Sequence, residues 1–332
     1  MTFQFPRTLA AATALALTIG AADARELRVS SFEPQQGFFS QTLQAWIDQI
    51  TPELSDQTSL RLYPGGILGA PPAQADLVRA GAADIAFVVP TYTAGLFPMT
   101  GVAEIPGLID RSATGTEILN TLLEEGALGD EYADYRVLAL FTTPGYRVFS
   151  AEPIAVPGDM AGLRLRSPSA FGARVLEMMG ASGVPIPAPQ VYENIERNVV
   201  SGAAWTMDAY STFRLSEVAP NITATRLIAS PLAILMNRAA YDGLPEEDRA
   251  VFVAHTGRVL AEWIAERVDS TEAAIETELR DAGEVTFVDL DEAGTAAWQA
   301  ALSGAADAWL AGQQGDSAAV VLERAREVAA QE

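Results

Sequence analysis

The segment Asp84-Ile85-Ala86-Phe87-Val88-Val89 (DIAFVV, residues 84–89) is apolar at every position after the first. A short, unbroken apolar run of this kind predicts a strand that is buried on both faces, as in a parallel sheet. Strand and helix patterns alternate around it, with strands expected at 26–32 and 59–63 and helices at 41–50 and 72–80. The alternation predicts an α/β fold with a mainly parallel sheet that helices cover on both faces.

A second unit of the same kind follows residue 145. Its expected elements are strands at 147–150, 163–166 and 203–206 and helices at 171–179 and 191–200. The extended run 223–236 is divided by Pro231 and could be a strand that crosses between two lobes. We therefore expect two lobes, formed by residues 25–145 with 231–268 and by residues 146–230 with 269–332.

The clearest helix pattern begins at Pro245. A proline suits the first turn of a helix, and the acidic residues 246–248 lie at its positive dipole end. Gly283 is suited to the C-cap position. No proline interrupts the segment, which favours one helix of about forty residues that braces both lobes. The alternative is two helices that break near Gly257 or Asp269.

The N-terminal residues predict export. Arg7 precedes the apolar run 9–21, and Ala22-Asp23-Ala24 is an A-x-A cleavage pattern, so residues 1–24 are interpreted as a secretory signal peptide. The alternative, an amphipathic helix, would need a polar face that this run lacks. No later stretch reaches about 18 apolar residues, so we expect a soluble mature chain that is not inserted in a membrane.

Composition excludes several classes of function. The chain of 332 residues has a net charge of −22, which would repel nucleic-acid phosphates and anionic lipids. It has no cysteine and one histidine, His255, so a thiol nucleophile and a histidine metal cluster are excluded. There is no G-x-S-x-G, no G-x-G-x-x-G and no P-loop lysine, so no nucleotide cofactor is expected. An exported hydrolase that uses two distant acidic residues stays open.

Two arginines are the main chemical signal from the residues alone. Arg164 and Arg166 flank Leu165 in a predicted strand, so both side chains leave the same face. At a strand end that faces a cleft, an arginine offers a fork of donors that matches a carboxylate. The alternative is a pair of surface arginines.

Several motifs in order along the chain carry a family resemblance. They are Tyr63-Pro64-Gly65-Gly66 with Leu68-Gly69, Gly81-Ala82-Ala83-Asp84-Ile85, Phe97-Pro98, Ile105-Pro106, Gly162-Leu163-Arg164-Leu165-Arg166-Ser167-Pro168, Gln190-Val191-Tyr192, Val200-Ser201-Gly202, and Asn237 to Pro245. With these motifs the chain resembles the periplasmic solute-binding subunits of tripartite ATP-independent periplasmic (TRAP) transporters, the DctP family.

The resemblance implies a two-lobe periplasmic binding protein fold (type II-like) with a long helix spanning both lobes. It implies that Arg166 pairs with the carboxylate of a small organic acid, while Arg164 stays exposed. A second arginine often precedes this strand; Arg147 is near that place, and a one-residue offset would put Tyr146 there. The implied partners are the membrane subunits of a TRAP transporter, and the chain is expected to be a monomer and not an enzyme. A ligand sensor for a signalling partner shares this fold.

Departures from the family narrow the ligand. Phe32, Val89 and Tyr92 occupy positions that are polar in members that bind sialic acid, so a sugar acid would leave hydroxyls unpaired. Members that bind 2-oxo acids through a cation have Glu-Trp where this chain has Ala204 and Trp205, so no metal is expected.

An acid with an apolar body remains. The expected apolar walls are Trp205, Tyr92 and Phe87, for which the alternative is ordinary core packing.

Overall fold

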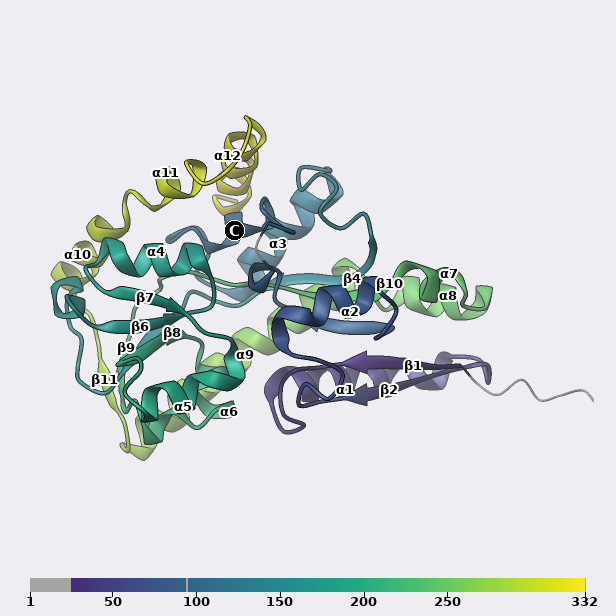
Figure 1. Ribbon diagram of the computed structural model, residues 1–332, viewed down its shortest axis with the longest axis horizontal. Coiled ribbons are helices and arrows are strands. Elements are labelled where there is room, and N and C mark those ends of the chain that lie inside the picture. The colour runs from purple at the N-terminus through teal and green to yellow at the C-terminus, as the bar shows by residue number, and fades with distance from the viewer. Residues whose placement is uncertain (1–24, 94, 332) are drawn as a thin grey trace, which may run out of the picture.

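The computed structural model describes residues 25–93 and 95–331 and contains two sheets that lie side by side (Figure 1). The first sheet has the strand order β2-β1-β3-β10-β4. Strands β1, β2 and β3 are parallel, and β10 runs antiparallel between β3 and β4. The bounds are β1 Arg25–Ser30, β2 Thr58–Tyr63, β3 Ile85–Val88, β4 Tyr135–Thr142 and β10 Pro231–Asn237.

The second sheet has the order β11-β9-β5-β8-β6-β7. Strand β5 is antiparallel to both of its neighbours, whereas the pairs β8–β6, β6–β7 and β9–β11 are parallel. The bounds are β5 Arg147–Ser150, β6 Arg164–Ser167, β7 Ser182–Pro185, β8 Gly202–Trp205, β9 Asn221–Thr223 and β11 Thr286–Val288.

Both sheets are mainly parallel, as the sequence predicts, and one strand in each, β10 in the first and β5 in the second, runs against the others. The chain crosses from the first sheet to the second between β4 and β5, and returns between β9 and β10. Each strand that first enters a sheet after a crossing, β5 or β10, runs antiparallel to both neighbours. The run around Pro231 is therefore the return crossing that the sequence indicates.

Helices cover both sheets and cross between them. The bounds are α1 Phe38–Ile50, α2 Gln74–Arg79, α3 Ser112–Glu124, α4 Ala170–Met178, α5 Val191–Glu196, α6 Met207–Thr212, α7 Arg238–Asp242, α8 Glu246–Ala254, α9 Arg258–Ala282, α10 Glu292–Leu302, α11 Ala305–Leu310 and α12 Ser317–Ala329.

The helix expected from Pro245 to Gly283 is two helices, α8 and α9. The break is at Gly257, whose φ of +73° is a backbone conformation that other residues rarely adopt. The Gly257 N–H donates to the Leu138 carbonyl, which fixes the break against β4. The alternative of a break near Gly257 is therefore correct, and no proline was needed because a left-handed glycine ends a helix as effectively.

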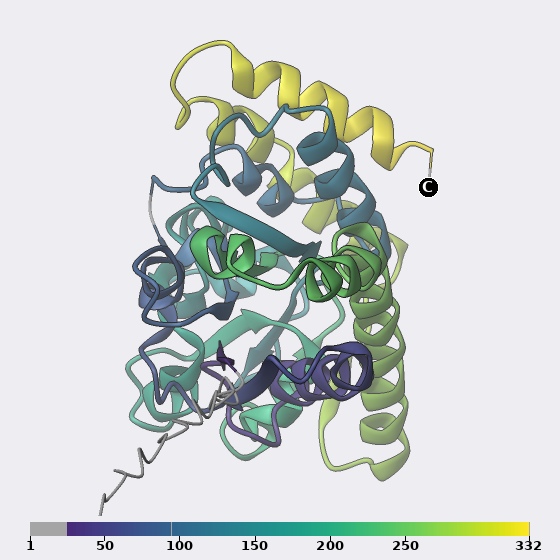
Figure 2. The same ribbon diagram turned by 90° about the vertical axis from the view of Figure 1, so that its right-hand side faces the viewer.

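Helix α9 still spans both lobes. Its 25 residues extend about 37 Å at 1.5 Å per residue. It packs against α3 and β4 beside the first sheet and against α6 beside the second. Figure 2 shows it running along one side of the molecule past both lobes.

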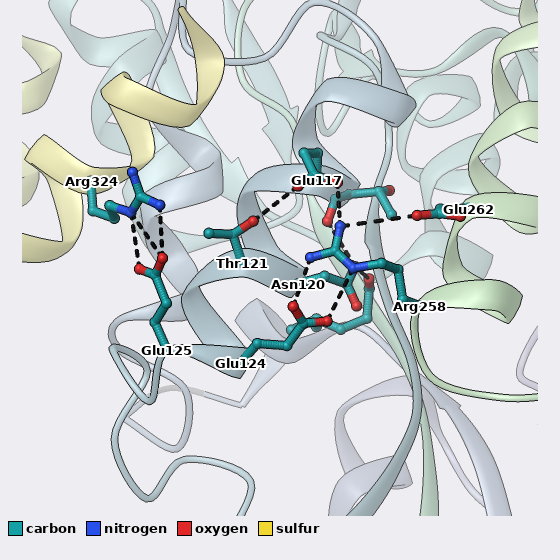
Figure 3. A network of polar contacts seen from close by, with 10 residues as sticks. Glu117, Asn120, Thr121, Glu124, Glu125, Arg258, Glu262 and Arg324 are labelled. Atoms are coloured by element: carbon teal, nitrogen blue, oxygen red, sulfur yellow. Dashed lines mark hydrogen bonds and ion pairs between the residues drawn. The ribbon is translucent and has the colours of Figure 1, made fainter. Parts of the chain in front are cut away.

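Ion pairs hold the start of α9 to the first lobe (Figure 3). Arg258 donates to Glu124 of α3 over 2.9 and 3.0 Å and also pairs with Glu117. Nearby, Arg324 of α12 pairs with Glu125 at 2.7 Å. We call this arginine-rich contact between α3, α9 and α12 the helix seam.

The division into lobes by residue number remains a prediction, and one segment differs from it. Residues 269–332 were expected in the second lobe, but α12 packs on α3 of the first lobe, with Val321, Leu322 and Ala325 in the same core cluster as Ile118. The C-terminal helices therefore pass from the second lobe back to the first (Figure 1). The signal-peptide prediction falls on residues 1–24, outside the described residues. Among the helices that the structure describes, none is long and apolar enough to cross a membrane.

Candidate functional site

A narrow cavity of about 30 Å³ lies between the two lobes. Its walls come from the ends of β1 and β3 and the start of α1 in the first lobe, from the ends of β7 and β8 and the start of α6 in the second, and from the crossing segments. The lining residues are Phe32, Glu33, Phe39, Phe87, Val89, Tyr92, Thr143, Tyr146, Ala188, Trp205, Thr206, Asp208, Ala209, Ser230 and Leu232. Six residues singled out in the sequence are thus brought together here: Phe32, Phe87, Val89, Tyr92, Tyr146 and Trp205.

A larger groove of about 610 Å³ lies beside the return crossing and α10, but it lacks buried charge. Its charged residues, Asp110, Arg226 and Arg326, are all exposed to solvent. A ligand charge is recognised most strongly by a partner that water does not screen. The smaller cavity has a buried charged side chain of this kind, Arg166, beside it. We therefore take the smaller cavity as the candidate site.

Arg166, near the end of β6, is not itself a lining residue but lies directly behind two of them, Tyr92 and Trp205, with a side chain that is 0% exposed. Its Nε donates to the Ile186 carbonyl over 2.9 Å, and Nη1 donates to the Ala204 carbonyl over 3.2 Å. Within residues 25–93 and 95–331 it forms no ion pair with a carboxylate. Arg164, two residues earlier on the same strand, is exposed.

Tyr92 connects Arg166 to the first lobe. Its hydroxyl oxygen accepts from Arg166 Nη2 and from the Ala188 N–H, each over 3.2 Å. Burial raises the pKa of Tyr92, although the charge of Arg166 opposes the shift. The hydroxyl therefore keeps its proton at neutral pH and offers it as a donor at the cavity.

Not all of the N–H donors of the Arg166 guanidinium have an acceptor in the described structure. A guanidinium has five N–H groups, and three of them have acceptors in the described structure. One N–H on each terminal nitrogen has no protein acceptor there. A buried charge in this state favours an anion that has two acceptor oxygens.

Aromatic rings form the apolar walls of the cavity. In the first lobe, Phe87 stacks between Phe32 and Phe39, with centroid distances of 5.0 and 4.6 Å. In the second lobe, Trp205 stacks on Phe213 at 5.1 Å, and the Arg166 guanidinium lies 4.2 Å from the centroid of the Trp205 ring. This cation–π contact holds the guanidinium in a fixed plane without neutralising its charge.

Tyr146 and Arg147 separate at the start of β5. Tyr146 lines the cavity, and its hydroxyl donates to Ser230 Oγ over 2.7 Å, which joins the two crossing segments. Arg147 does not line the cavity; its Nη2 pairs with Glu276 of α9 at 2.5 Å. Adjacent strand residues point to opposite faces, so only one of these two side chains can reach the cavity.

Two acidic residues of the cavity were missed in the sequence. Glu33 and Asp208 are 3% and 2% exposed, and one comes from each lobe. Burial, reinforced by the charge of Asp208, raises the pKa of Glu33 to about 8. Burial also raises the pKa of Asp208 and, on α9, of Glu272. Single acidic residues in a chain with 43 of them carry no signal of burial, so only the tertiary structure could identify these.

The single histidine of the chain does not line this cavity. Among the described residues, no group of three or more His, Cys, Asp and Glu side chains could hold a metal ion. His255 ends α8, far along the fold, and its Nε2 lies 3.0 Å from Glu53. What the arrangement can do is hold an anion at Arg166 with an apolar body against the aromatic rings.

Two lobes joined by crossing segments, with a buried cationic side chain at a cavity between them, define a solute-binding protein of the two-lobe type. The model of the family "bacterial extracellular solute-binding protein, family 7" (DctP) matches residues 14–312. The chain belongs to this family, whose members include the solute-binding proteins of TRAP transporters.

Three relatives illustrate the family. The 2,3-diketo-L-gulonate-binding periplasmic protein YiaO of Escherichia coli is 25% identical over 74% of this chain and 75% of its own. A marine metagenome TRAP protein specific for aromatic acids, solved with 3-hydroxybenzoate, has a TM-score of 0.88 at 25% identity, over 93% of this chain and 98% of its own. A Bordetella bronchiseptica TRAP protein with bound mandelate has a TM-score of 0.83 at 27% identity, over 92% and 99%.

Proposed function

We propose that this protein captures a small organic carboxylate with an apolar or aromatic body for a TRAP-type transporter. The observation that carries the proposal is Arg166, which is fully buried at the cavity between the lobes and has no carboxylate partner among the described residues. Leaving such a charge unpaired is costly, and a ligand carboxylate would satisfy it.

The contacts of Arg166 suggest how the carboxylate is held. The two ligand oxygens accept the free N–H groups of the guanidinium, and the Tyr92 hydroxyl is close enough to Nη2 to donate a third hydrogen bond. The backbone acceptors at Ile186 and Ala204 and the ring of Trp205 fix the orientation of the guanidinium before the ligand arrives. This preorganisation reduces the entropy lost on binding.

The walls support an apolar body for the ligand. Phe32, Phe87 and Val89 lie on one side and Trp205 on the other, so a flat ring or a short branched chain would be enclosed by apolar surface. The relatives above that bind 3-hydroxybenzoate and mandelate are consistent with an aromatic acid. A sugar acid would bury several hydroxyls against these rings at a cost of about 1–3 kcal/mol each.

The small volume of the cavity indicates a closed arrangement of the lobes. A volume of about 30 Å³ is too small to hold an aromatic acid, so the lobes separate for binding and release. Tyr92, which bonds to both Arg166 and Ala188 across the gap, closes the contact. The closed form then docks on the transporter's membrane subunits. In this proposal the exported chain acts in the periplasm as a monomer, without a metal or cofactor and without catalysis.

A thermal-shift and calorimetry series with benzoate, 3-hydroxybenzoate and mandelate tests the proposal. At least one acid should raise the melting temperature with increasing concentration and be recovered unchanged. Arg166→Ala should abolish that shift. The matched control, Arg164→Ala, removes an exposed arginine from the same strand and should bind like the native chain. Equal binding by the Arg166→Ala variant, or conversion of the acid to a product, would overturn the proposal.

A further inference from the structure

The cavity has a second polar region, formed by Asp208 and Glu33, that a simple carboxylate does not use. Asp208 lies in the first turn of α6 on the second lobe, and Glu33 follows β1 on the first lobe. Both residues line the cavity together with the aromatic rings. We call these two side chains the acidic end of the cavity.

Asp208 is short of partners. Its side chain is 2% exposed, and neither of its two carboxylate oxygens meets a hydrogen-bond donor at bonding geometry among the described residues. The groups near enough to act on this carboxylate are the Thr206 hydroxyl, the Glu272 carboxyl when it carries a proton, and the backbone N–H groups of Ala209 and Asp208 itself. A buried carboxylate in this state costs stability unless something else donates to it.

Glu33 is held in place by its backbone surroundings. One oxygen, Oε2, accepts the Phe39 N–H over 2.8 Å at the start of α1. The backbone carbonyl of Glu33 accepts from the Ser40 hydroxyl over 3.1 Å. The Ser40 N–H also acts on this carboxyl, so the Glu33 side chain is fixed against the 13-residue helix α1 while still lining the cavity.

The acidic end does not contact Arg166. The three hydrogen bonds of the Arg166 guanidinium go to the Ile186 and Ala204 carbonyls and to the Tyr92 hydroxyl, and among the described residues neither Glu33 nor Asp208 bonds to it. The cavity thus has a cationic group behind its wall, aromatic rings and two acids that the cation does not use.

We propose that the ligand is a zwitterion, with its carboxylate on Arg166 and a protonated amine on Asp208 and Glu33. The proposal rests on the carboxylate function proposed above and adds the substrate class, a cyclic or aromatic amino acid or imino acid. The aromatic walls enclose the body of the ligand between its two charged groups.

The charges of the cavity favour an ammonium over a neutral hydroxyl. A carboxylate alone neutralises Arg166 but leaves the acidic end to bind protons or remain unpaired. A secondary ammonium has two N–H donors and a positive charge. It can therefore donate hydrogen bonds to the carboxylate oxygens of Asp208 and Glu33 and also neutralise a negative charge there. A hydroxyl brings one donor and no charge. Opposite charges that are both removed from water pair strongly when their geometry is fixed.

Five ring acids of similar shape test the proposal. Cyclohexanecarboxylate is the uncharged-body probe, and piperidine-2-, 3- and 4-carboxylate place a ring ammonium at increasing distance from the carboxylate. Calorimetry on the full native chain should give at least one piperidine acid an affinity ten or more times that of cyclohexanecarboxylate. 3-Hydroxycyclohexanecarboxylate, the neutral-donor probe, should gain no more than threefold.

Two variants connect any preference to the acidic end. Asp208→Asn keeps the size of the side chain and should reduce the preference for the piperidine acid to threefold or less, with cyclohexanecarboxylate binding unchanged within threefold. Glu33→Gln should weaken the preference in the same direction. Asp48→Asn, an exposed aspartate of α1, is the matched control and should keep the full preference.

The outcomes separate the two proposals. If cyclohexanecarboxylate binds as tightly as every piperidine acid, or the hydroxy acid gains as much as they do, the zwitterion proposal is overturned while the carboxylate function stands. Retention of the preference by both Asp208→Asn and Glu33→Gln overturns it as well. If no probe binds, or Arg166→Ala binds them all normally, the carboxylate function itself fails.

Discussion

Arg258 in the helix seam and Arg166 at the cavity are both arginines, but they differ in exposure to solvent and in whether acidic side chains surround them. Arg258 is 30% exposed and has three acidic neighbours, Glu117, Glu124 and Glu262, as Figure 3 shows. Arg166 is fully buried and has only neutral acceptors among the described residues. Acidic residues outnumber basic ones by 43 to 21, so a shortage of carboxylates does not explain why Arg166 has no acidic partner among the described residues.

The difference shows what each arginine is for. In the seam, Arg258 lowers the pKa of Glu124 and connects α9 to α3, so its charge is used within the fold. At the cavity, Arg166 lies on β6, which pairs with β8. Its side chain packs among apolar residues, and its hydrogen-bond acceptors are two backbone carbonyls and the Tyr92 hydroxyl. A charge that the fold leaves unpaired is available to a ligand, and substitutions at the two sites should therefore have opposite effects.

The largest difference between substitutions of Arg166 and Arg258 should be in ligand affinity. Arg166→Met removes the charge and keeps an apolar chain of similar length, and we expect the affinity for the best acid to fall about 100-fold or more, or about 3 kcal/mol. Arg258→Met should leave it within threefold. Calorimetry on both variants checks the pair. An equal loss in both variants would mean that Arg166 acts only through the fold.

Tyr92 should have the next largest effect. Tyr92→Phe removes the hydroxyl that accepts from Arg166 and from the Ala188 N–H, and leaves both donors unpaired in a closed cavity. We expect affinity to fall about tenfold, or about 1–2 kcal/mol. The control is Tyr63→Phe, which removes an exposed hydroxyl that donates to Glu26. Unchanged affinity in Tyr92→Phe would remove Tyr92 from the site.

For the stability of the ligand-free protein, we expect the Arg258 substitution to have the larger effect and the Arg166 substitution the smaller one. Arg258→Met breaks the seam and should lower the free energy of unfolding by about 1 kcal/mol, because exposed pairs contribute little individually and more as a network. Arg166→Met loses hydrogen bonds but also removes a buried unpaired charge, so its stability should stay within about 1 kcal/mol of native. Denaturant melts of both variants measure this. A large loss in Arg166→Met alone would contradict the contrast.

The pH dependence of stability should also distinguish the cavity from the helix seam. Burial raises the pKa of Glu33 to about 8 and that of Glu104 to about 7, from ordinary values near 4.5. A carboxyl with a raised pKa favours the folded state below its unfolded value, and this contribution is lost as pH rises through the folded value. The melting temperature should therefore fall between pH 5 and pH 8.

Glu33→Gln isolates one contribution to this pH dependence. The variant cannot ionise at position 33, so its melting temperature should fall less steeply over the same range than that of the native chain. Glu323→Gln, an exposed glutamate of α12, should fall as steeply as the native chain. Identical slopes for the native chain and Glu33→Gln would mean that Glu33 is not buried in the ligand-free protein in solution.

Much of this protein could be predicted from the sequence because the relevant signals are local. The apolar run 84–89 becomes β3, and its pattern required no knowledge of its neighbours. The alternation around Leu165 predicts that Arg164 and Arg166 leave the same face of β6, and the family resemblance added that Arg164 is exposed, as it is, and that Arg166 faces the ligand. Motif order along the chain was sufficient to predict the family to which the chain belongs.

Other features depended on contacts between distant residues. Gly257 ends α8 because its N–H meets Leu138 of β4, a contact that the pattern of one helix does not contain. The offset between Tyr146 and Arg147 was decided by Glu276, which pairs with Arg147 on the face away from the cavity. The burial of Glu33 and Asp208 depends on two lobes meeting, and nothing adjacent to either residue in the sequence indicates it.

The sequence by itself determined the class of fold and the family, and it singled out the arginine that we propose receives an acid, because periodicity and motif spacing act over short stretches of chain. Only the tertiary structure decided that Arg166 has no carboxylate partner within the described chain while Arg258 has three acidic neighbours. Whether a charge is paired depends on which segments fold against it and how much water they exclude. That is a property of three-dimensional packing and not of composition.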